Sequence, residues 1–323
     1  MFGIKTHNHL VVLGGNSNPG LLSEIANHLG VHPAAVMVDR FPEGEIHIQI
    51  LENIRGKDVF IVQSTCTPPN ENLMELLILI DAVRRASAKR ITAVLPFFGY
   101  ARQDRKDKPR VPITAKLVAN LITEAGADRV LAMDLHAGQI QGFFDIPVDH
   151  LYSINVLGEY LRKKGLKNLV VVSPDIGGIR MARAYSKFLG SSFAIVDKRR
   201  EDATQTHVMH IIGSVEGKNV VIVDDLVSTA GSLVEAVKAL KEAGCLDLFA
   251  AVVHPVLAGP AIERLEHSEL KELIVTNSIP LSSEKKIGKI IQLSVASLLA
   301  EAIRRIHQNE SVSSLFDKAG VEA

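Results

Sequence analysis

The chain has 323 residues, enough for two domains of ordinary size, and its 47% apolar and 22% charged residues are typical of a globular protein. Its 36 basic residues balance its 36 acidic residues, which argues against a polyanionic partner held by bulk electrostatics. Two distant cysteines, Cys66 and Cys245, make neither a disulfide framework nor a C-x-x-C site, and no stretch is long and apolar enough for a membrane span. The amino terminus lacks the charged and apolar regions of a secretion signal, so we expect a cytoplasmic protein.

The first half of the chain alternates buried strands with helices. The run HLVVLGG at 9–15 predicts a strand that ends in a small-residue turn, followed by a helix that closes on Leu29-Gly30. A strand with a basic corner at Arg40, a buried strand in GKDVFIVQST at 56–65, a helix and another strand follow. Strands that alternate with helices in this order predict a mainly parallel sheet covered by helices.

The most charged loop of the chain is FFGYARQDRKDKPRVPITAKL at 97–117, which follows a buried strand and precedes a helix whose first turn holds Pro112. Basic side chains alternate in it with two acidic ones: Arg102, Arg105, Lys106, Lys108, Arg110, Asp104 and Asp107. A solvated loop and a nucleic-acid patch are the alternatives, and the interleaved acidic residues weaken the second. The position at the carboxyl end of a strand favours polyphosphate binding by arginine.

The segment RVLAMDLHAGQIQGFF at 129–144 predicts another buried strand, which ends in Asp134 and His136. A single histidine in such a place is more often structural than a ligand. The residues alone therefore assign His136 no chemical role.

The second half of the chain repeats the order of the first. NLVVVSP at 168–174 resembles HLVVLGG, and its helix again closes on Leu-Gly before a strand with a basic corner at Lys198. GKNVVIVDDL at 217–226 then matches GKDVFIVQST, and each is followed by a helix and a strand. We therefore expect an α/β fold of two tandem domains, residues 1–151 and 152–323, each with a mainly parallel sheet flanked by helices. The late helix SVASLLAEAIRRIHQ can pack on either domain.

Two segments of the second domain carry candidate residues for chemistry. SPDIGG at 173–178 places Asp175 at the end of a strand, before a glycine pair that lets a ligand approach the backbone. DKRRED holds Lys198 and Arg200 just past another strand, and EDATQTHVMH shows no apolar period. This stretch is typical of a mobile basic loop that closes over a reacting phosphate, with an exposed hairpin as the alternative.

The segment VVIVDDLVSTAGS at 220–232 carries the clearest signal of a ligand site. Its apolar run predicts a strand buried on both faces, with Asp224 and Asp225 at the carboxyl end, where open α/β sheets bind ligands. The turn from Ser228 to Ser232 leads into a helix and offers N–H groups and hydroxyls that attract phosphate; an N-capped helix is the alternative. Two carboxylates beside an anion site require hydroxyl groups or a cation on the ligand, and a sugar phosphate satisfies both halves. A third carboxylate, Asp175, can hold Mg²⁺ together with substrate oxygens.

Two absences narrow the site. The first domain carries Gln63-Ser64 where the second has the acidic pair, so we expect the sugar-phosphate loop in the second domain alone. The chain also lacks G-x-x-x-x-G-K-[ST], and its nearest approach, GSVEGKN at 213–219, has the wrong spacing and precedes a strand. Any use of ATP therefore proceeds without a P-loop.

Together, these motifs resemble those of the ribose-phosphate pyrophosphokinases (PRPP synthases), in order and over nearly the whole chain. They are the acidic pair with its STAGS turn, YARQDRKD, MDLHAGQIQGFFDIPVDHL, SPDIGG, DKRR and the late ESVSSLF. That family consists of two phosphoribosyltransferase-type domains in tandem, in agreement with the duplication. The resemblance implies transfer of the β,γ-diphosphoryl group of Mg-ATP to the C1 hydroxyl of ribose 5-phosphate. The products are PRPP and AMP, for nucleotide, histidine and tryptophan biosynthesis.

The resemblance also implies a role for each matching residue. The ribose hydroxyls are expected on Asp224 and Asp225, and the 5-phosphate on Ser228, Thr229, Ala230, Gly231 and Ser232. ATP is expected on Arg102, Gln103 and Asp107, with Phe41 of a neighbouring subunit stacked on adenine and Glu43 and Glu45 nearby. The expected metal-site residues are His136 and Asp175, although Mg²⁺ as a hard ion prefers oxygen ligands. Lys198 and Arg200 are the expected catalytic residues, which stabilise charge on the transferring group.

The family's regulatory site for ADP and phosphate, between subunits, matches Arg110, Gln141, Asp149, Ser311 and Ser313. Members are commonly hexamers, and a shared adenine site requires at least a dimer, so we expect a homo-oligomer. The chain departs from the family pattern where Ser228 and Ser232 replace the Asp and final Thr of D-T-A-G-T, where Glu43 replaces Asp or Asn, and where Ser314 replaces Tyr. We expect activity to survive with altered affinity for ribose 5-phosphate, because the turn amides and Thr229 provide most of the anion binding.

Three alternatives account for less of the sequence. A phosphoribosyltransferase shares the acidic loop but usually has one such domain and lacks the RQDRKD segment and the loop lysine. A non-catalytic regulatory homologue has disrupted phosphate turns and insertions, whereas this chain keeps STAGS, Lys198 and Arg200. A nucleic-acid-binding protein is disfavoured by the balanced charge and by the lack of aromatic residues among the basic ones. We therefore expect an enzyme that binds ATP and ribose 5-phosphate, with no nucleic-acid or membrane partner.

Overall fold

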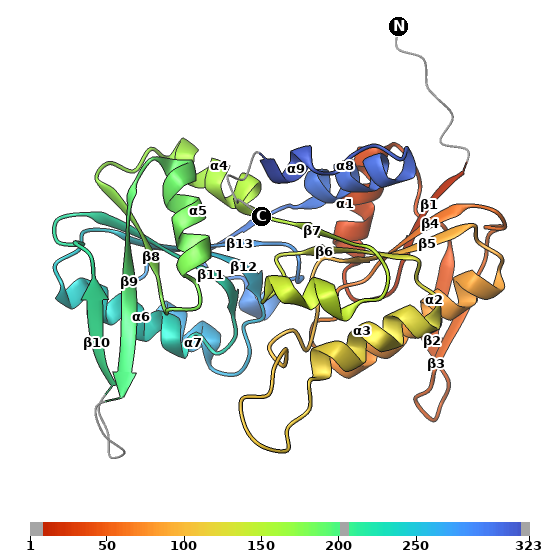
Figure 1. Cartoon of the computed structure of the whole chain (residues 1–323), viewed down its shortest axis with the longest axis horizontal. Helices are drawn as coiled ribbons and strands as arrows, with labels where there is room; N and C mark the ends of the chain where they lie inside the picture. The colour runs from red at the N-terminus through yellow and green to blue at the C-terminus, as the bar shows by residue number, and fades with distance from the viewer. Residues whose placement is uncertain (1–8, 201–206, 318–323) are drawn as a thin grey trace, which may run out of the picture. The chain divides into compact units, whose positions relative to one another are not determined.

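The computed structural model describes residues 9–200 and 207–317, which form two compact units (Figure 1). Unit 1 contains the residues up to Leu151 together with Ser278–Pro280 and Val295–Leu315. Unit 2 contains Tyr152–Asn277, Leu281–Ser294 and the residues from Phe316. In the described ranges, no helix is long and apolar enough to cross a membrane.

The core of unit 1 is a 5-stranded parallel sheet with the strand order β1-β4-β5-β6-β7. Its strands are β1 (Leu10–Gly14), β4 (Asp58–Val62), β5 (Arg90–Leu95), β6 (Arg129–Met133) and β7 (Val148–Leu151). A separate antiparallel hairpin consists of β2 (Val36–Arg40) and β3 (Ile46–Ile50). Every residue of β4 is buried, as expected for a central strand with helices on both faces of its sheet.

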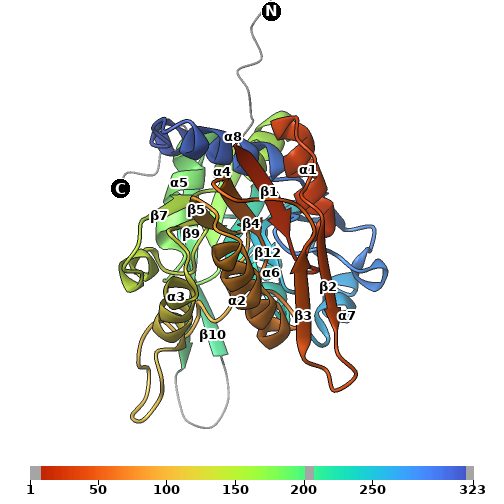
Figure 2. The same ribbon diagram turned by 90° about the vertical axis from the view of Figure 1, so that its right-hand side faces the viewer.

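Two pairs of helices cover the sheet of unit 1, one pair on each face (Figure 2). The helices α1 (Pro19–Leu29) and α8 (Ala296–His307) form one pair, and α2 (Pro69–Arg85) and α3 (Thr114–Ala125) form the other. Asn18 caps α1 by accepting a hydrogen bond from the N–H of Leu21 at 3.3 Å, and the left-handed Gly30 ends it at φ 68°. The helix α3 begins at Thr114, so the prediction that Pro112 lies in its first turn is wrong: Pro112 precedes the helix.

The late helix α8 packs within unit 1. Its residues Leu299 and Ile303 are buried, and it contacts α1. At its end, Nδ1 of His307 lies 2.7 Å from Oδ2 of Asp58, whose carboxylate also accepts two hydrogen bonds from the guanidinium of Arg90. Because Arg90 also donates to the Ile306 carbonyl at 2.9 Å, this polar cluster ties the end of α8 to the starts of β4 and β5.

Unit 2 contains a 7-stranded sheet with the order β10-β9-β8-β11-β12-β13-β14, in which only β10 runs antiparallel to its neighbour. Its strands are β8 (Leu169–Ser173), β9 (Ser192–Arg200), β10 (His207–Ile212), β11 (Asn219–Val227), β12 (Leu248–Pro255), β13 (Glu272–Thr276) and β14 (Ile290–Leu293). Its helices are α4 (Ile154–Lys164), α5 (Ile179–Leu189), α6 (Gly231–Glu242) and α7 (Ala261–Glu266). As Figure 1 shows, α4 and α5 lie on one face of this sheet and α6 and α7 on the other.

The two units share one strand order, since β8-β11-β12-β13-β14 in unit 2 corresponds to β1-β4-β5-β6-β7 in unit 1. This confirms the predicted α/β class with mainly parallel sheets. The units differ in their hairpins, because β9 and β10 join the main sheet whereas β2 and β3 do not. The prediction of a loop in EDATQTHVMH is wrong for its last four residues. They belong to β10, where backbone pairing such as Lys198 with Met209 forms the strand without an apolar side-chain pattern.

Candidate active site

The acidic pair, Asp224 and Asp225, lies on the strand β11 of unit 2. The strand is fully buried from Val220 to Val223 and continues through the half-buried Asp224 and Asp225 to Val227. Its pairing with β8 stops at Ile222, whereas its pairing with β12 continues to Val227. The two aspartates therefore lie beyond the edge that β8 covers, at the carboxyl end of the sheet, where the sequence predicts them.

A third carboxylate, Asp175, follows the end of β8 and is exposed. Its Oδ1 accepts a hydrogen bond from the N–H of Gly178 at 2.9 Å, which fixes the turn before α5. Burial raises the pKa of Asp224 well above its usual value, and the charges of Asp225 and Asp175 raise it further. Three carboxylates in mutual repulsion gain stability from a cation or from the hydroxyl groups of a ligand, as the sequence predicts.

The turn after β11 presents an uncapped helix start. The helix α6 begins at Gly231, and in the described chain no side chain forms a cap hydrogen bond there, in contrast to Asn18 at α1. This outcome argues against the alternative of an ordinary N-capped helix. The residue before it, Ala230, adopts a left-handed backbone at φ 58°, which is unusual for a residue with a Cβ atom. Backbone N–H groups at such a helix start form a ready anion site.

The corresponding position of unit 1 is filled by the protein itself. Gln63 is fully buried; its Nε2 donates to Oε1 of the buried Glu75 at 2.9 Å, and its Oε1 accepts from Ser17 at 2.8 Å. A Cβ atom at Gly15 would lie 2.0 Å from the same Glu75 oxygen. Unit 1 therefore has a buried, hydrogen-bonded Gln63 at the position where unit 2 has Asp224. This agrees with the prediction from the sequence that the sugar-phosphate site lies in unit 2.

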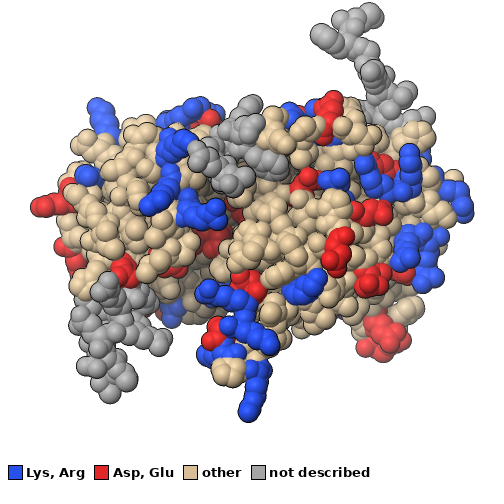
Figure 3. Space-filling model, in the orientation of Figure 1, with Lys and Arg blue, Asp and Glu red and all other residues tan. Residues whose placement is uncertain are grey.

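The charged loop after β5 lines a cavity of about 500 Å³ in unit 1. The predicted ATP residues Arg102, Gln103 and Asp107 and the predicted metal residue His136 all line it, with Asp104, Arg105, Val111, Pro112, Ala137 and Gln139. Nε2 of Gln139 donates to Oδ2 of Asp104 at 3.1 Å and so connects the loop to the segment after β6. Figure 3 shows Lys and Arg side chains gathered where this loop projects from the surface. The structure thus brings these four residues together, in a cavity whose lining includes two arginines, Arg102 and Arg105, and two aspartates, Asp104 and Asp107.

The remaining predicted ATP residues, Phe41, Glu43 and Glu45, lie at the exposed turn between β2 and β3. Phe41 is 44% exposed, and its ring centroid lies 4.7 Å from that of His47. The turn closes through hydrogen bonds between the Phe41 N–H and the Glu45 carbonyl and between the Gly44 N–H and the Phe41 carbonyl. None of the three lines the cavity described above. They form an exposed aromatic and acidic tip of the hairpin.

The segment that carries His136 is fixed by a residue that sequence reasoning missed. His150, which is buried on β7, accepts a hydrogen bond through Nε2 from the backbone N–H of Leu135 at 2.9 Å. This bond requires the tautomer with a free Nε2 lone pair, and the side-chain amide of Gln141 lies 3.4 Å from the other ring nitrogen. His150 therefore connects the segment before His136 with one of the predicted regulatory residues.

The predicted catalytic residues Lys198 and Arg200 lie on β9, in unit 2. The backbone of Lys198 pairs with Met209 and that of Arg200 with His207. These residues therefore lie in paired antiparallel strands, as in the hairpin that the sequence leaves as an alternative. The intervening segment, 201–206, lies outside the described residues.

The predicted regulatory residues belong to unit 1. Arg110 is exposed on the charged loop with a left-handed backbone at φ 63°, and Gln141 lies in a 3₁₀ turn, Gly138–Phe143. Asp149 on β7 forms an ion pair with Arg129 at 2.6 Å. Ser311 and Ser313 are exposed in the segment after α8. None of them lines the cavity of the charged loop.

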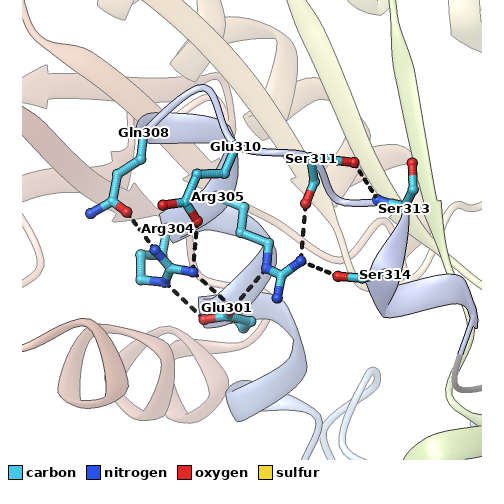
Figure 4. A network of polar contacts seen from close by, with 8 residues as sticks. All are labelled: Glu301, Arg304, Arg305, Gln308, Glu310, Ser311, Ser313 and Ser314. Carbon is cyan, nitrogen blue, oxygen red and sulfur yellow. Dashed lines mark hydrogen bonds and ion pairs between the residues drawn. The ribbon is translucent and has the colours of Figure 1, made fainter.

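A polar network at the end of α8 holds the segment that carries Ser311 and Ser313 (Figure 4). Arg305 donates to the Ser311 carbonyl at 3.0 Å and to the hydroxyl of Ser314, and Oε1 of Glu301 accepts from Nε of Arg305 at 2.7 Å. Hydrogen bonds from Arg304 and Arg305 lower the pKa of Glu301 to about 2. Ser314, which replaces the tyrosine of the family pattern, therefore accepts a hydrogen bond from Arg305 in this chain.

Comparisons with known proteins agree with this arrangement. Residues 10–126 match the family described as the N-terminal domain of ribose phosphate pyrophosphokinase, and residues 200–317 match the phosphoribosyl synthetase-associated domain. A ribose-phosphate pyrophosphokinase of Helicobacter pylori is 55% identical over 305 residues, which are 94% of this chain and 95% of that protein. One of Caldanaerobacter subterraneus is 56% identical over 310 residues, 96% of this chain and 98% of that protein. The crystal structure of a phosphoribosylpyrophosphate synthetase from Mycobacterium smegmatis superposes with a TM-score of 0.89 at 42% identity, covering 93% of this chain and 99% of that chain.

Proposed function

The chain belongs to the ribose-phosphate pyrophosphokinase family and is an enzyme of this kind, and we propose that it transfers the diphosphoryl group of ATP to the C1 hydroxyl of ribose 5-phosphate. The C1 oxygen attacks the β-phosphorus, and the bond from the β-phosphorus to the bridging oxygen of the α-phosphate breaks. AMP leaves with that oxygen, PRPP forms, and the hydroxyl proton passes to solvent. The product serves the biosynthesis of nucleotides, histidine and tryptophan.

The observation that supports this proposal most strongly is the pairing of unlike features at the end of β11. An uncapped helix start with a left-handed Ala230 attracts an anion, whereas Asp224 and Asp225 repel one. A ligand that carries a phosphate together with hydroxyl groups or a bound cation satisfies the two halves, and ribose 5-phosphate is such a ligand. We assign the 5-phosphate to residues 228–232 and the ribose hydroxyls to the two aspartates.

We assign ATP to the cavity of unit 1. Arg102 offers its planar guanidinium to phosphate oxygens, and Gln103 and Asp107 offer hydrogen-bond partners. Phe41, on the exposed hairpin tip, stacks on the adenine of a neighbouring subunit, with Glu43 and Glu45 beside it. A 44% exposed aromatic side chain that does not line the cavity of the charged loop fits a partner supplied by another copy of the chain. The homo-oligomer is a hexamer in this proposal.

The donor set of the chain fits Mg²⁺ bound mainly through substrate. In the described residues, no group of three or more His, Cys, Asp or Glu side chains is arranged to hold a metal by itself. Mg²⁺ characteristically takes one or two carboxylates and completes its shell with phosphate oxygens and water, which suits the oxygens of Asp175; the imidazole of His136 suits it less. We assign one metal-site residue to each unit, His136 to unit 1 and Asp175 to unit 2. Bound with ATP, Mg²⁺ neutralises charge on the phosphate oxygens.

We assign the catalytic role to Lys198 and Arg200 on β9. Transfer of a phosphoryl-type group requires mainly alignment and neutralisation of charge, so two cations near the reacting group are sufficient and no covalent nucleophile is needed. We further propose that ADP and phosphate regulate the enzyme through Arg110, Gln141, Asp149, Ser311 and Ser313. The ion pair of Asp149 with Arg129 keeps one of these residues in a fixed position.

The test is the release of AMP by the purified chain from Mg-ATP, measured with and without ribose 5-phosphate. The proposal predicts AMP release that depends on the sugar phosphate and saturates with it. Release of ADP in place of AMP would indicate a γ-phosphoryl kinase. Absence of both, in a folded protein that still binds ATP, would indicate a non-catalytic regulatory homologue.

A further inference from the structure

The phosphate turn of unit 2, residues 228–232, is hydrogen-bonded to the segment 257–264. Neither the sequence motifs nor the proposed function gives this segment a role. Three consecutive carbonyl groups, from the end of β11 into the turn, accept hydrogen bonds from it. The Val227 carbonyl accepts from the N–H of Leu257 at 3.0 Å, and the Ser228 carbonyl accepts from the N–H of Ala258 at 2.9 Å. The third, the Thr229 carbonyl, accepts from the guanidinium Nη1 of Arg264 on α7 at 3.0 Å.

We propose that Arg264 is a positioning residue for the phosphate turn, which aims the N–H of Ala230 at the phosphate of a sugar-phosphate ligand. A trans peptide is planar, so its C=O and N–H groups point in opposite directions. Because the Thr229 carbonyl points at Arg264, the N–H of Ala230 in the same peptide points away from it. The same argument applies to the N–H groups of Ser228 and Thr229, which leaves three successive donors directed away from the 257–264 segment.

The directed N–H groups are available to a ligand. In the described part of the chain, the backbone N–H groups of Ser228, Thr229 and Ala230 donate no hydrogen bond to the protein. Ala230 is 4% exposed, and its left-handed backbone redirects the chain into α6. A side-chain donor such as Arg264 is needed at Thr229, because no backbone N–H of the 257–264 segment reaches that carbonyl as Leu257 and Ala258 reach the two before it.

The space around Arg264 supports this role. A Cβ atom at Gly231 would lie 3.1 Å from Nη1 of Arg264, tighter than nine in ten real Cβ contacts, so the glycine gives the guanidinium room to approach the turn without a shift. Arg264 is exposed and forms no ion pair with a carboxylate in the described residues, so its positive charge is not neutralised. The residue thus combines an oriented hydrogen bond with a charge that favours an anion nearby.

The inference rests on the proposed function, and its test uses the full-length protein with ribose 5-phosphate as the probe. Arg264→Met removes the donor and keeps most of the stem, whereas Arg264→Lys keeps the charge and one donor. Lys271→Met is the matched control, because it removes one positive charge from unit 2 at an exposed ion pair with Asp247, before the start of β12. For each variant we would measure kcat, the KM for ribose 5-phosphate and the KM for ATP, and ribose 5-phosphate binding by calorimetry.

We expect Arg264→Met to raise the KM and the Kd for ribose 5-phosphate at least tenfold, with kcat and the KM for ATP changed less than threefold. We expect Arg264→Lys to recover part of the affinity and Lys271→Met to behave as the wild type. Unchanged ribose 5-phosphate affinity in a folded Arg264→Met, or equal losses for both substrates, would overturn the inference. If Arg264→Met does not fold, Arg264→Leu takes its place, since it also removes the donor to the Thr229 carbonyl, and an unchanged ribose 5-phosphate affinity in that folded variant would overturn the inference equally. A wild type without sugar-dependent AMP release would refute the proposed function, whereas none of the outcomes for the Arg264 variants would.

Discussion

The carboxylate of Asp224 accepts a hydrogen bond through Oδ1 from the backbone N–H of its neighbour Asp225, at 2.9 Å. This local bond lowers the pKa of Asp224, but burial and the charges of Asp225 and Asp175 outweigh it, so the pKa is raised. The pair is therefore a poorly stabilised acidic cluster in the absence of ligand. Such a cluster is suited to accept hydrogen bonds from sugar hydroxyl groups.

The first prediction concerns this pair. Asp224→Asn combined with Asp225→Asn should raise the KM for ribose 5-phosphate about 10- to 100-fold, because a hydrogen bond to a charged group contributes about 1.5–3 kcal/mol. The KM for ATP should stay the same, since the cavity that we propose for ATP lies in unit 1. Steady-state kinetics with each substrate varied in turn measures both. Asp247→Asn, which removes one exposed carboxylate of unit 2, serves as the control. An unaltered KM for ribose 5-phosphate in the double variant would exclude the two aspartates from ribose binding.

The second prediction concerns Lys198. Lys198→Ala should lower kcat about 100-fold or more and leave both KM values within about threefold, because in the proposed function the charge of Lys198 acts mainly in the transition state. The control is Lys238→Ala, which removes a lysine whose side chain is 77% exposed on α6. A normal kcat in the Lys198 variant would exclude this residue from catalysis.

The third prediction concerns regulation. Arg110→Ala should relieve inhibition by ADP at least tenfold, because Arg110 offers a guanidinium to phosphate groups on an exposed part of the charged loop. Uninhibited turnover should change little. Lys108→Ala, two residues away on the same exposed loop, is the control for a general loss of positive charge. Inhibition that persists unchanged in the Arg110 variant would exclude Arg110 from the regulatory site.

The fourth prediction concerns stability at low pH. The folded-state pKa of Glu301 is about 2, below its ordinary value of 4.5, so its contribution to stability is present above pH 4.5 and is lost as the pH falls toward 2. Because the side chain is 35% exposed, we expect only about 1 kcal/mol after solvent screening. Glu301→Gln should therefore be less stable than the wild type at pH 6, and the difference should be much smaller at pH 2.5, as the pH approaches the folded-state pKa of Glu301. Urea unfolding at the two pH values measures this; a constant difference would contradict the assignment.

Much of the fold is predictable because its strands are buried on both faces. The runs in β4 and β11 contain consecutive apolar residues, and each is followed by a helix, so type and order follow from the sequence alone. The sequence does not distinguish the strand β10 from a mobile loop, because its pairing with β9 depends on backbone groups rather than on side-chain periodicity. The short apolar run of β13 carries the same signal as β4 and could have been found by the same pattern.

The candidate site is predictable only where its chemistry is carried by side chains in a motif. Asp224, Asp225 and the STAGS turn were found because acidic and phosphate-binding residues adjoin at a strand end. His150 and Arg264 were missed because each acts on a backbone group far away in sequence, on Leu135 and Thr229 respectively. No local pattern encodes such a contact, since it exists only after the strands and helices have packed.

The measurement that tests the central claim most directly is the yield of PRPP per AMP. The purified chain would be given Mg-ATP and ribose 5-phosphate, AMP would be quantified, and PRPP would be captured by coupling to a phosphoribosyltransferase and its base. The account predicts one PRPP for each AMP, with both reduced in parallel in the Asp224→Asn, Asp225→Asn variant at limiting ribose 5-phosphate. AMP formed without PRPP, or PRPP formation that is indifferent to the two aspartates, would contradict it.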